Sequence, residues 1–410
     1  MTRVQRSTFF IACAVIGALV GGLAMMGAAA LTREDVPPRE PAARPSISSS
    51  SAPEDDTAKP SKLAPQGSIL LAWTPGGLPP NTERVLERTT AVRAATTVEA
   101  GLDWIESSRS PEGTVLDRTP GGMAIPFENA YIEPSDYADF VPLADRDEIR
   151  ALEQGNAVLA QTSEELRGAG VGTRLRLKGS SLDITGVVAD VTTGGYEALT
   201  AGSAPERWPT VDRFVLIRLA PKASPDRVER RIRRLLQPGQ GLRMRPSGVN
   251  PFLRYGDAVL PQLIMKKTFG EFSLRSQAGS DFFEIEESWR ARNIQAARVP
   301  VLGRVVCHRA LIPQLRAAMM ELTERGLAYT INPGQFAGCF AARFVFGGLV
   351  HRISHHSWGV ALDINASENP SGIRPNLDRR LVSVMRDHGF TWGGDWLVPD
   401  GMHFEWVAFD

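Results

Sequence analysis

The pattern of hydrophobic and polar positions divides the chain into four stretches, and the first is a long apolar run near the N-terminus. Phe9–Leu31 contains 23 residues without a charged side chain. Because about 20 apolar residues in a helix cross the hydrocarbon core of a bilayer, the run predicts a single transmembrane helix over 9–31. Arg3 and Arg6 precede it, so the positive-inside rule predicts a cytoplasmic stub over 1–8 and an extracytoplasmic location for everything that follows.

A cleaved signal peptide is the alternative for the same run, since it ends in the small residues Ala28, Ala29 and Ala30. Signal peptides carry apolar regions of about 7–15 residues, and this longer run favours a retained anchor in the cell membrane. Both interpretations send the chain to the same compartment. The second stretch, 32–67, is rich in Pro and Ser and cannot bury a core, so we expect a tether there.

The third stretch, 68–246, alternates short apolar runs with polar turns and predicts an α+β module. Ser224 followed by Pro225 is typical of a helix start, and Val228 and Ile232 give that helix one apolar face. The arginines of 230–234 fit its solvated face, with binding of an anionic polymer as the alternative. Further elements are expected as strands at 69–73, 157–160 and 214–219, a hairpin at 173–188, and helices from 145 and 163.

This central stretch offers no visible catalytic chemistry. It contains no His and no evident pair of nucleophile and base. Its order of elements, with the segments 141–149, 157–160, 170–177 and 185–190, resembles the extracytoplasmic domain of FtsX/MacB-type permeases. The resemblance implies a binding or spacing module that can take a membrane protein as its partner. Such permeases carry further membrane helices after this domain, and no run of that kind follows here, so transport is not expected.

The fourth stretch, 247–410, ends in two segments with strand-like alternation. Val360–Asn365 puts Asp363 on the polar face of one expected strand, and Met402–Val407 puts His403 on that of another. Two such strands side by side would bring the carboxylate and the imidazole together.

His356 is a third candidate for the same place. It lies seven residues before Asp363, and the bend that Gly359 permits is needed to turn it toward the same face. Two imidazoles and one carboxylate, with a fourth position left to water, form the ligand set of a catalytic zinc ion. Asp400, just before the last strand, is then the candidate general base. A hydrogen-bonded His–Asp pair at the surface is the alternative, because this spacing also occurs by chance.

Two longer motifs carry a family resemblance. S-x-H-x-W-G-x-A-x-D-I-N over 354–365, followed by W-G-G-D-W and M-H-F-E within 392–405, resembles the VanX/VanY-type zinc D-alanyl-D-alanine peptidases. The most similar branch includes cell-wall carboxypeptidases and phage endolysins that cut L-Ala–D-Glu bonds. The resemblance covers about 250–410, and it implies an α+β zinc peptidase domain with a small antiparallel sheet.

The same resemblance implies a cofactor, a substrate and a role for each site residue. The cofactor would be Zn²⁺, with His356, Asp363 and His403 as its ligands. Asp400 would be the general base, and Arg343 would stabilise the oxyanion. The substrate would be the stem peptide of peptidoglycan.

Charge and cysteine content narrow the classes of protein further. With 46 basic and 46 acidic residues, the chain has no global positive field that would recruit nucleic acid. Three Cys exclude both a disulfide-dense scaffold and a Cys-rich zinc ribbon. Cys307 and Cys339 flank a helix expected over 311–325, and outside the cytoplasm we expect them to form a disulfide. Two buried thiols are the alternative, and Cys13 lies within the expected membrane helix.

Other polar residues of the fourth stretch have competing interpretations. His355 is a substitute ligand, and Glu405 is the substitute base because it shares a strand face with His403. His308 is expected to cap or pack against the helix over 311–325, and His388 to end a helix over 377–387.

Together these patterns predict a membrane-anchored cell-wall metallopeptidase. Its parts are the stub, the transmembrane helix, the tether, the central α+β module and the C-terminal zinc peptidase domain. It would act as a D,D-carboxypeptidase or as an endopeptidase on peptidoglycan stem peptides. The alternative is a non-catalytic adaptor that holds wall peptide or a membrane partner, although such a domain has no need of both a complete ligand set and a base.

Overall fold

A computed structural model of the chain describes residues 69–208, 211–246, 260–277, 279–345 and 352–408. Contacts divide the chain into two units, Met1–Lys59 and Pro60–Asp410, and all described residues lie in the second. The expected stub, membrane helix and tether (1–8, 9–31 and 32–67) lie outside the described residues. The boundary expected between 246 and 247 stays a prediction.

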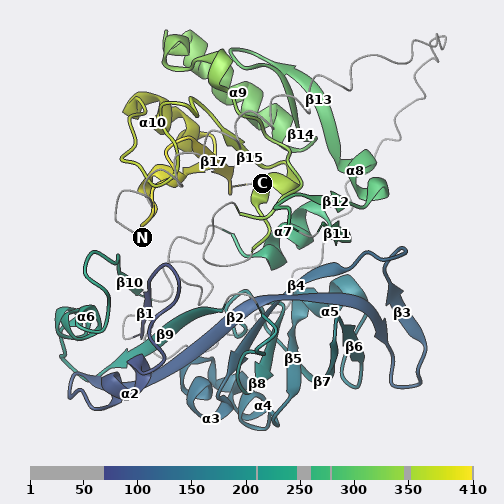
Figure 1. The fold of residues 1–410 in the computed structure, drawn as a ribbon, viewed down its shortest axis with the longest axis vertical. Helices are drawn as coiled ribbons and strands as arrows, with labels where there is room; N and C mark the ends of the chain where they lie inside the picture. Colours follow the sequence, from purple (N-terminus) through teal and green to yellow (C-terminus); the bar gives the residue numbers. More distant parts are fainter. Residues whose placement is uncertain (1–68, 209–210, 247–259, 278, 346–351, 409–410) are drawn as a thin grey trace, which may run out of the picture. The chain divides into compact units, whose positions relative to one another are not determined.

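The residues from 69 to 246 form a ten-stranded mixed sheet (Figure 1). In spatial order its strands are β10 (Arg243–Pro246), β1 (Ile69–Trp73), β9 (Asp212–Leu219), β2 (Val92–Arg109), β4 (Ile125–Ile132), β8 (Ala198–Ala201), β5 (Asn156–Ala160), β7 (Ser180–Val188) and β6 (Arg174–Leu177), with β3 (Val115–Arg118) beside β2. The pairs β4–β8 and β5–β7 are parallel, and the other neighbours are antiparallel. The predicted strands and the hairpin β6–β7 are confirmed.

The long strand β2 closes part of this sheet on itself. It pairs with β9 and β4 along its earlier part and with β6 near its end, so β2, β4, β8, β5, β7 and β6 form a ring. The register of β2 shifts at Val92/Ala94 and at Ile105/Ser107, and irregularities of this kind allow a strand to bend. Side chains such as Phe127 fill the interior of the ring. Because the ring closes, each of these six strands is paired with a neighbouring strand on both of its edges.

Short helices accompany the sheet: α2 (Thr82–Glu87), α3 (Pro134–Tyr137), α4 (Arg146–Arg150), α5 (Gln161–Arg167) and α6 (Pro225–Arg233), with 3-10 turns η2 (Ala138–Phe140) and η3 (Leu143–Asp145). The predicted cap of α6 is confirmed, because the Asp226 N–H donates to Ser224 Oγ at 3.3 Å. Val228 and Ile232 are buried, whereas Arg230 and Arg231 are exposed. This helix therefore presents its arginines to solvent, as expected.

The C-terminal elements are smaller. They are α7 (Gln262–Phe269), β11 (Leu274–Ser276), β12 (Phe283–Ile285), α8 (Glu287–Asn293), β13 (Ile294–Val299), β14 (Gly303–His308), α9 (Leu311–Glu324), η4 (Ala328–Thr330), η5 (Pro333–Gln335), η6 (His355–Trp358), β15 (Ala361–Asp363), α10 (Arg379–Asp387), β16 (Phe390–Trp392), η7 (Gly393–Asp395) and β17 (His403–Trp406). Helix α9 lies along the hairpin β13–β14 (Figure 1). The strands form three separate antiparallel sheets, β11–β12, β13–β14 and β15–β17–β16, where one was expected.

The fold class predicted from the sequence requires correction. Among the described residues no helix is both long and apolar enough to cross a membrane. The longest described helix, α9, has 14 residues, fewer than the roughly 20 that span a bilayer. The structure supports a mixed α+β fold with several sheets, and it gives no support to the transmembrane helix that the predicted class included.

A buried group of four charged side chains joins α7 to the ten-stranded sheet. Lys266 Nζ lies 2.9 Å from both carboxylate oxygens of Glu197, and an Arg167 guanidinium nitrogen lies 2.7 Å from Glu197 and 2.6 Å from Glu271. Burial would raise the pKa of Glu197, but the two cations outweigh it and lower that pKa. Loss of any one member would leave a buried charge uncompensated. All four side chains are therefore needed where α7 packs on the ten-stranded sheet.

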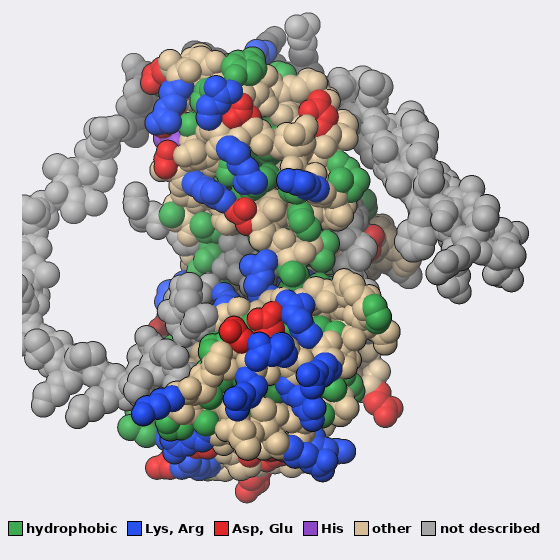
Figure 2. Space-filling view, turned by 90° about the vertical axis from the view of Figure 1, so that its left-hand side faces the viewer, with side chains coloured by type: hydrophobic (Ala, Val, Ile, Leu, Met, Phe, Trp, Pro, Cys, Tyr) green, Lys and Arg blue, Asp and Glu red, His purple; other side chains and the backbone are tan. Residues whose placement is uncertain are grey.

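The surface carries charges of both signs, in keeping with the zero net charge of the chain. On the face drawn in Figure 2, Lys and Arg side chains are spread over the described residues with Asp and Glu among them. Hydrophobic side chains are scattered between them in small groups, as is normal for a folded surface.

The expected disulfide is confirmed. Cys307, in β14, is bonded to Cys339, with the two Cα atoms 5.3 Å apart. Both residues are buried. The bond links the segment that contains Cys339 covalently to the hairpin β13–β14.

Removal of this disulfide should destabilise the C-terminal region. The bond joins residues 32 apart, and the chain-entropy model gives a contribution of about 3–4 kcal/mol for such a loop. Urea unfolding of the Cys307→Ala/Cys339→Ala variant should show this loss, with Cys13→Ala as the control. An unchanged free energy of unfolding, or thiol labelling of both positions in the unreduced protein, would contradict the bond.

Candidate metal centre

Asp363 and His403 come together because β15 and β17 pair antiparallel. The register places Asp363 directly opposite His403. Their side chains leave the strands on the same face, and Asp363 Oδ1 lies 3.0 Å from His403 Nδ1. On the other face Leu362 and Phe404 are fully buried. The alternation read from the sequence therefore holds in both strands.

His356 reaches the same place from the 3-10 turn η6. Gly359 ends this turn with φ +69°, a conformation that favours glycine. A Cβ at that position would also lie 2.7 Å from His308 N. From its place within this turn, His356 Nε2 lies 3.3 Å from Asp363 Oδ2 and 3.3 Å from His403 Nδ1. The bend expected at Gly359 thus brings the second imidazole to the carboxylate.

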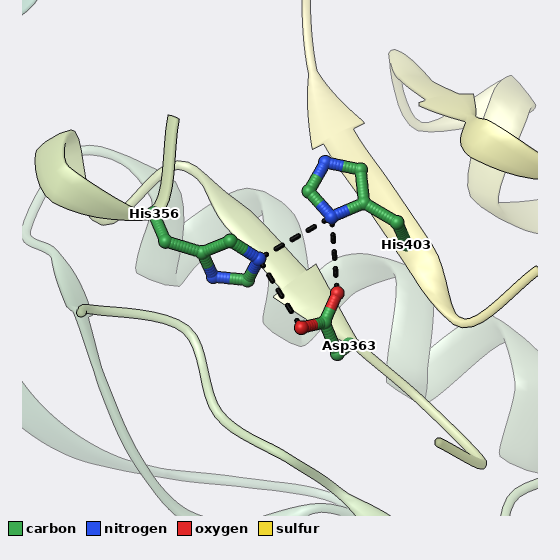
Figure 3. A group of neighbouring side chains, drawn as sticks. All are labelled: His356, Asp363 and His403. Atoms are coloured by element: carbon green, nitrogen blue, oxygen red, sulfur yellow. Dashed lines mark hydrogen bonds and ion pairs between the residues drawn. The ribbon is translucent and has the colours of Figure 1, made fainter. Parts of the chain in front are cut away.

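The three side chains can hold a metal ion. One ligand atom from each of His356, Asp363 and His403 lies within 4.8 Å of the others, and all three residues are buried. In Figure 3 both imidazoles direct a nitrogen toward the Asp363 carboxylate. Two imidazole nitrogens and one carboxylate oxygen are the donor set of catalytic zinc sites, so the residues present fit a zinc ion.

The electrostatics of the group favour a cation at its centre. Burial alone would raise the pKa of Asp363, but His356 and His403 outweigh it and hold that pKa well below its usual range. Burial would lower the pKa of His403, whereas hydrogen bonds to Asp363 and Glu405 raise it to about 10. A buried carboxylate needs positive partners, and a bound metal ion at the centre of this group would be one of them.

Asp400 and Arg343 lie within electrostatic reach of this group. Asp400 Oδ1 is buried and has no hydrogen-bond partner among the described residues, and burial raises the pKa of its carboxyl. Burial lowers the pKa of Arg343, and the charges of Asp363 and Asp400 oppose that shift. The structure therefore brings both candidate catalytic side chains toward the three candidate ligands.

Gly393 explains part of the W-G-G-D-W motif. The Asp400 N–H donates to the Gly393 carbonyl at 2.9 Å. A Cβ on Gly393 would lie 2.7 Å from the Asp400 carbonyl oxygen and 3.2 Å from His403 Cβ. Glycine is needed here so that the Asp400 loop can approach η7 closely, which the sequence pattern did not show.

The substitute residues expected from the sequence lie outside the ligand group. His355 Nδ1 and His403 Nε2 each lie 2.9 Å from Glu405, on the far side of the His403 ring. Two other histidines also lie outside the ligand group. His388 Nε2 lies 2.5 Å from Glu321. Burial lowers the pKa of His308 to about 4. The contact of Glu405 with His403 had a signal in the i, i+2 spacing along β17, whereas its contact with His355 had none.

The tryptophans of the two motifs are mainly structural. Trp358 and Trp392 are buried in the hydrophobic core, and Trp392 Nε1–H donates to the Gly401 carbonyl at 2.8 Å. The Trp396 ring packs against the His403 ring with centroids 5.2 Å apart. Of the three, Trp396 contacts a candidate ligand directly.

Comparisons with known proteins bear on the C-terminal segment above all. The periplasmic region of MacB from Actinobacillus actinomycetemcomitans is 10% identical over 45% of this chain and 91% of that chain, with a TM-score of 0.32. A TM-score this low carries no argument about fold or function. No curated protein gives a significant match to the chain. Residues 350–406, which contain His356, Asp363 and His403, match the D-alanyl-D-alanine carboxypeptidase family.

Proposed function

We propose that the chain is a zinc-dependent metallopeptidase that hydrolyses a peptide bond in the stem peptides of peptidoglycan. The family match supports a peptidase. The observation that carries the zinc proposal is the buried group of two imidazoles and one carboxylate inside the matched segment. Hydrolysis of a terminal D-Ala and cleavage between L-Ala and D-Glu are both compatible with this site.

His356, Asp363 and His403 bind the metal in this proposal. A bound zinc ion supplies a Lewis acid and activates water at neutral pH. The three ligands come from one turn and two paired strands, so little of the site has to be ordered when metal binds. The Trp396 ring packs against the His403 ring, with the two ring planes tilted by 49°.

Asp400 moves the proton. Its buried Oδ1 has no partner among the described residues and is free to accept a proton from the attacking water. The raised pKa of Asp400 brings it nearer to neutrality, which helps it to pass that proton to the leaving amine. Arg343 supplies a positive charge within electrostatic reach of Asp363 and Asp400, and in this proposal it stabilises the oxyanion of the tetrahedral intermediate.

The proposed compartment is outside the cytoplasm, where the substrate lies. Structural disulfides persist in such compartments and are rare in the cytosol. The buried Cys307–Cys339 bond next to the ligand group supports this location.

Purified muropeptides incubated with the zinc-loaded full chain test the function. We expect cleavage that a chelator abolishes and that added zinc restores. In the mass spectrum, loss of one Ala identifies a carboxypeptidase, whereas separation after the sugar-proximal Ala identifies an endopeptidase. Stoichiometric zinc with muropeptide binding but no cleavage would contradict the enzyme and favour the adaptor.

Replacement of any proposed ligand should remove the metal. His356→Ala, Asp363→Ala and His403→Ala should each lose zinc together with activity, because three protein ligands leave none to spare. Metal content after gel filtration measures the loss, with His388→Ala as the control outside the ligand group. A variant of the three that keeps one zinc ion per chain would show that its residue is wrongly assigned.

Asp400→Asn should separate metal binding from catalysis. The amide keeps the size and polarity of the side chain but cannot accept the proton. Zinc should therefore stay bound while turnover of muropeptide falls by roughly 10²–10⁴-fold. If this substitution also removes zinc, Asp400 is a ligand, and if activity stays near that of the wild type, another residue is the base.

A further inference from the structure

Glu405 is a buried carboxylate that the proposed reaction does not use. It follows His403 by two residues on β17, so the two side chains lie on one face of the strand. Its side chain is only 8% exposed. Oε1 lies 2.9 Å from His403 Nε2, and Oε2 lies 2.9 Å from His355 Nδ1. Both oxygens of this carboxylate are thus held by imidazoles.

The two nitrogens of His403 face different partners. Nδ1 faces Asp363 and His356, whereas Nε2 points away from them (Figure 3) and meets Glu405. A neutral imidazole has one N–H and one lone pair, and an ionised carboxylate can only accept. Carboxylates lie at both nitrogens of His403, so a metal ion at Nδ1 decides the tautomer: the one proton of the neutral ring is then on Nε2, where Glu405 accepts it. In that tautomer the lone pair of Nδ1 faces the candidate metal position beside Asp363 and His356.

His356 is held in a matching way by a different acceptor. Its Nδ1 lies 2.7 Å from the Cys339 carbonyl oxygen, which can only accept. The proton is therefore on Nδ1, and the lone pair of Nε2 faces Asp363 and His403. The two imidazoles use opposite nitrogens toward the site, and each has an acceptor behind it. Only His403 has a charged acceptor.

We propose that Glu405 is a positioning residue for His403, and that His355 positions Glu405 in turn. The inference rests on the metal site of the proposed function. A carboxylate behind a ligating imidazole fixes its tautomer and ring orientation and strengthens it as a donor. His355 gives the second oxygen of Glu405 a partner, so the carboxylate is held at both ends although it is buried.

Zinc affinity of the full-length, metal-free chain tests the proposal, measured by competition with a chromophoric chelator. Glu405→Leu should weaken zinc binding by about 10–100-fold. Glu405→Gln keeps an oxygen that accepts from His403 Nε2–H, so it should recover part of that loss. The matched control is Glu321→Leu, which breaks another Glu–His pair whose described hydrogen bonds involve none of the three ligands. It should leave zinc affinity unchanged.

Proton NMR of the zinc-loaded proteins provides a signal that would not change if Glu405 had only a structural role. The wild type and Glu405→Gln should show the hydrogen-bonded Nε2–H resonance of His403 at low field. Glu405→Leu should lose or shift it. An unshifted resonance in Glu405→Leu would overturn the assignment of Glu405 as the acceptor.

A double variant tests the role of His355. If His355 acts through Glu405, His355→Ala should weaken zinc binding less than Glu405→Leu does. The His355→Ala/Glu405→Leu variant should then be no weaker than Glu405→Leu alone. Additive losses would overturn the connection between the two residues. If Glu405→Leu fails to fold, Glu405→Gln takes its place in the single variant and in the double variant with His355→Ala.

The outcomes distinguish this inference from the function on which it rests. A wild-type chain that binds no zinc overturns the proposed function and the inference together. If the wild type and Glu405→Leu bind zinc equally tightly, the inference alone is overturned and the peptidase proposal stands.

Discussion

The antiparallel pairing of β15 with β17 sets Asp363 directly opposite His403, and the ligand group depends on that register. A slip of one residue would turn one of the two side chains to the opposite face of the sheet. The buried neighbours Leu362 and Phe404, which lie opposite one another in the next position, oppose such a slip because it would expose apolar surface. The core of the C-terminal region thus fixes the geometry of its polar site.

The segment that contains Cys339 connects the remaining ligand to the same strand. The Asp363 N–H donates to the Gly338 carbonyl at 3.1 Å, and the next carbonyl, that of Cys339, lies 2.7 Å from His356 Nδ1. The disulfide to Cys307 joins this segment to β14. One short stretch of chain therefore contacts the strand of one ligand and the ring of another, and the disulfide holds it in place.

Local patterns in the sequence predicted local structure, and contacts between distant residues account for the rest. Alternation predicted the faces of Asp363 and His403, and Gly359 indicated the bend that brings in His356. The ring closed by β2 was not predicted, because the pairing of Ile105 with Leu177 joins distant residues and lies directly before a register shift. The pairing of His355 with Glu405 likewise depends on how the turn η6 packs beside β17, which no spacing reveals.

X-ray absorption at the zinc edge of the loaded full chain tests the central claim most directly, namely that two imidazoles and one carboxylate of this chain hold the metal and leave a position open. The account predicts only nitrogen and oxygen neighbours, at about 2.0–2.2 Å, with outer-shell scattering from two imidazoles. A sulfur neighbour at about 2.3 Å, scattering from fewer than two imidazoles, or a chain that retains no zinc would contradict it.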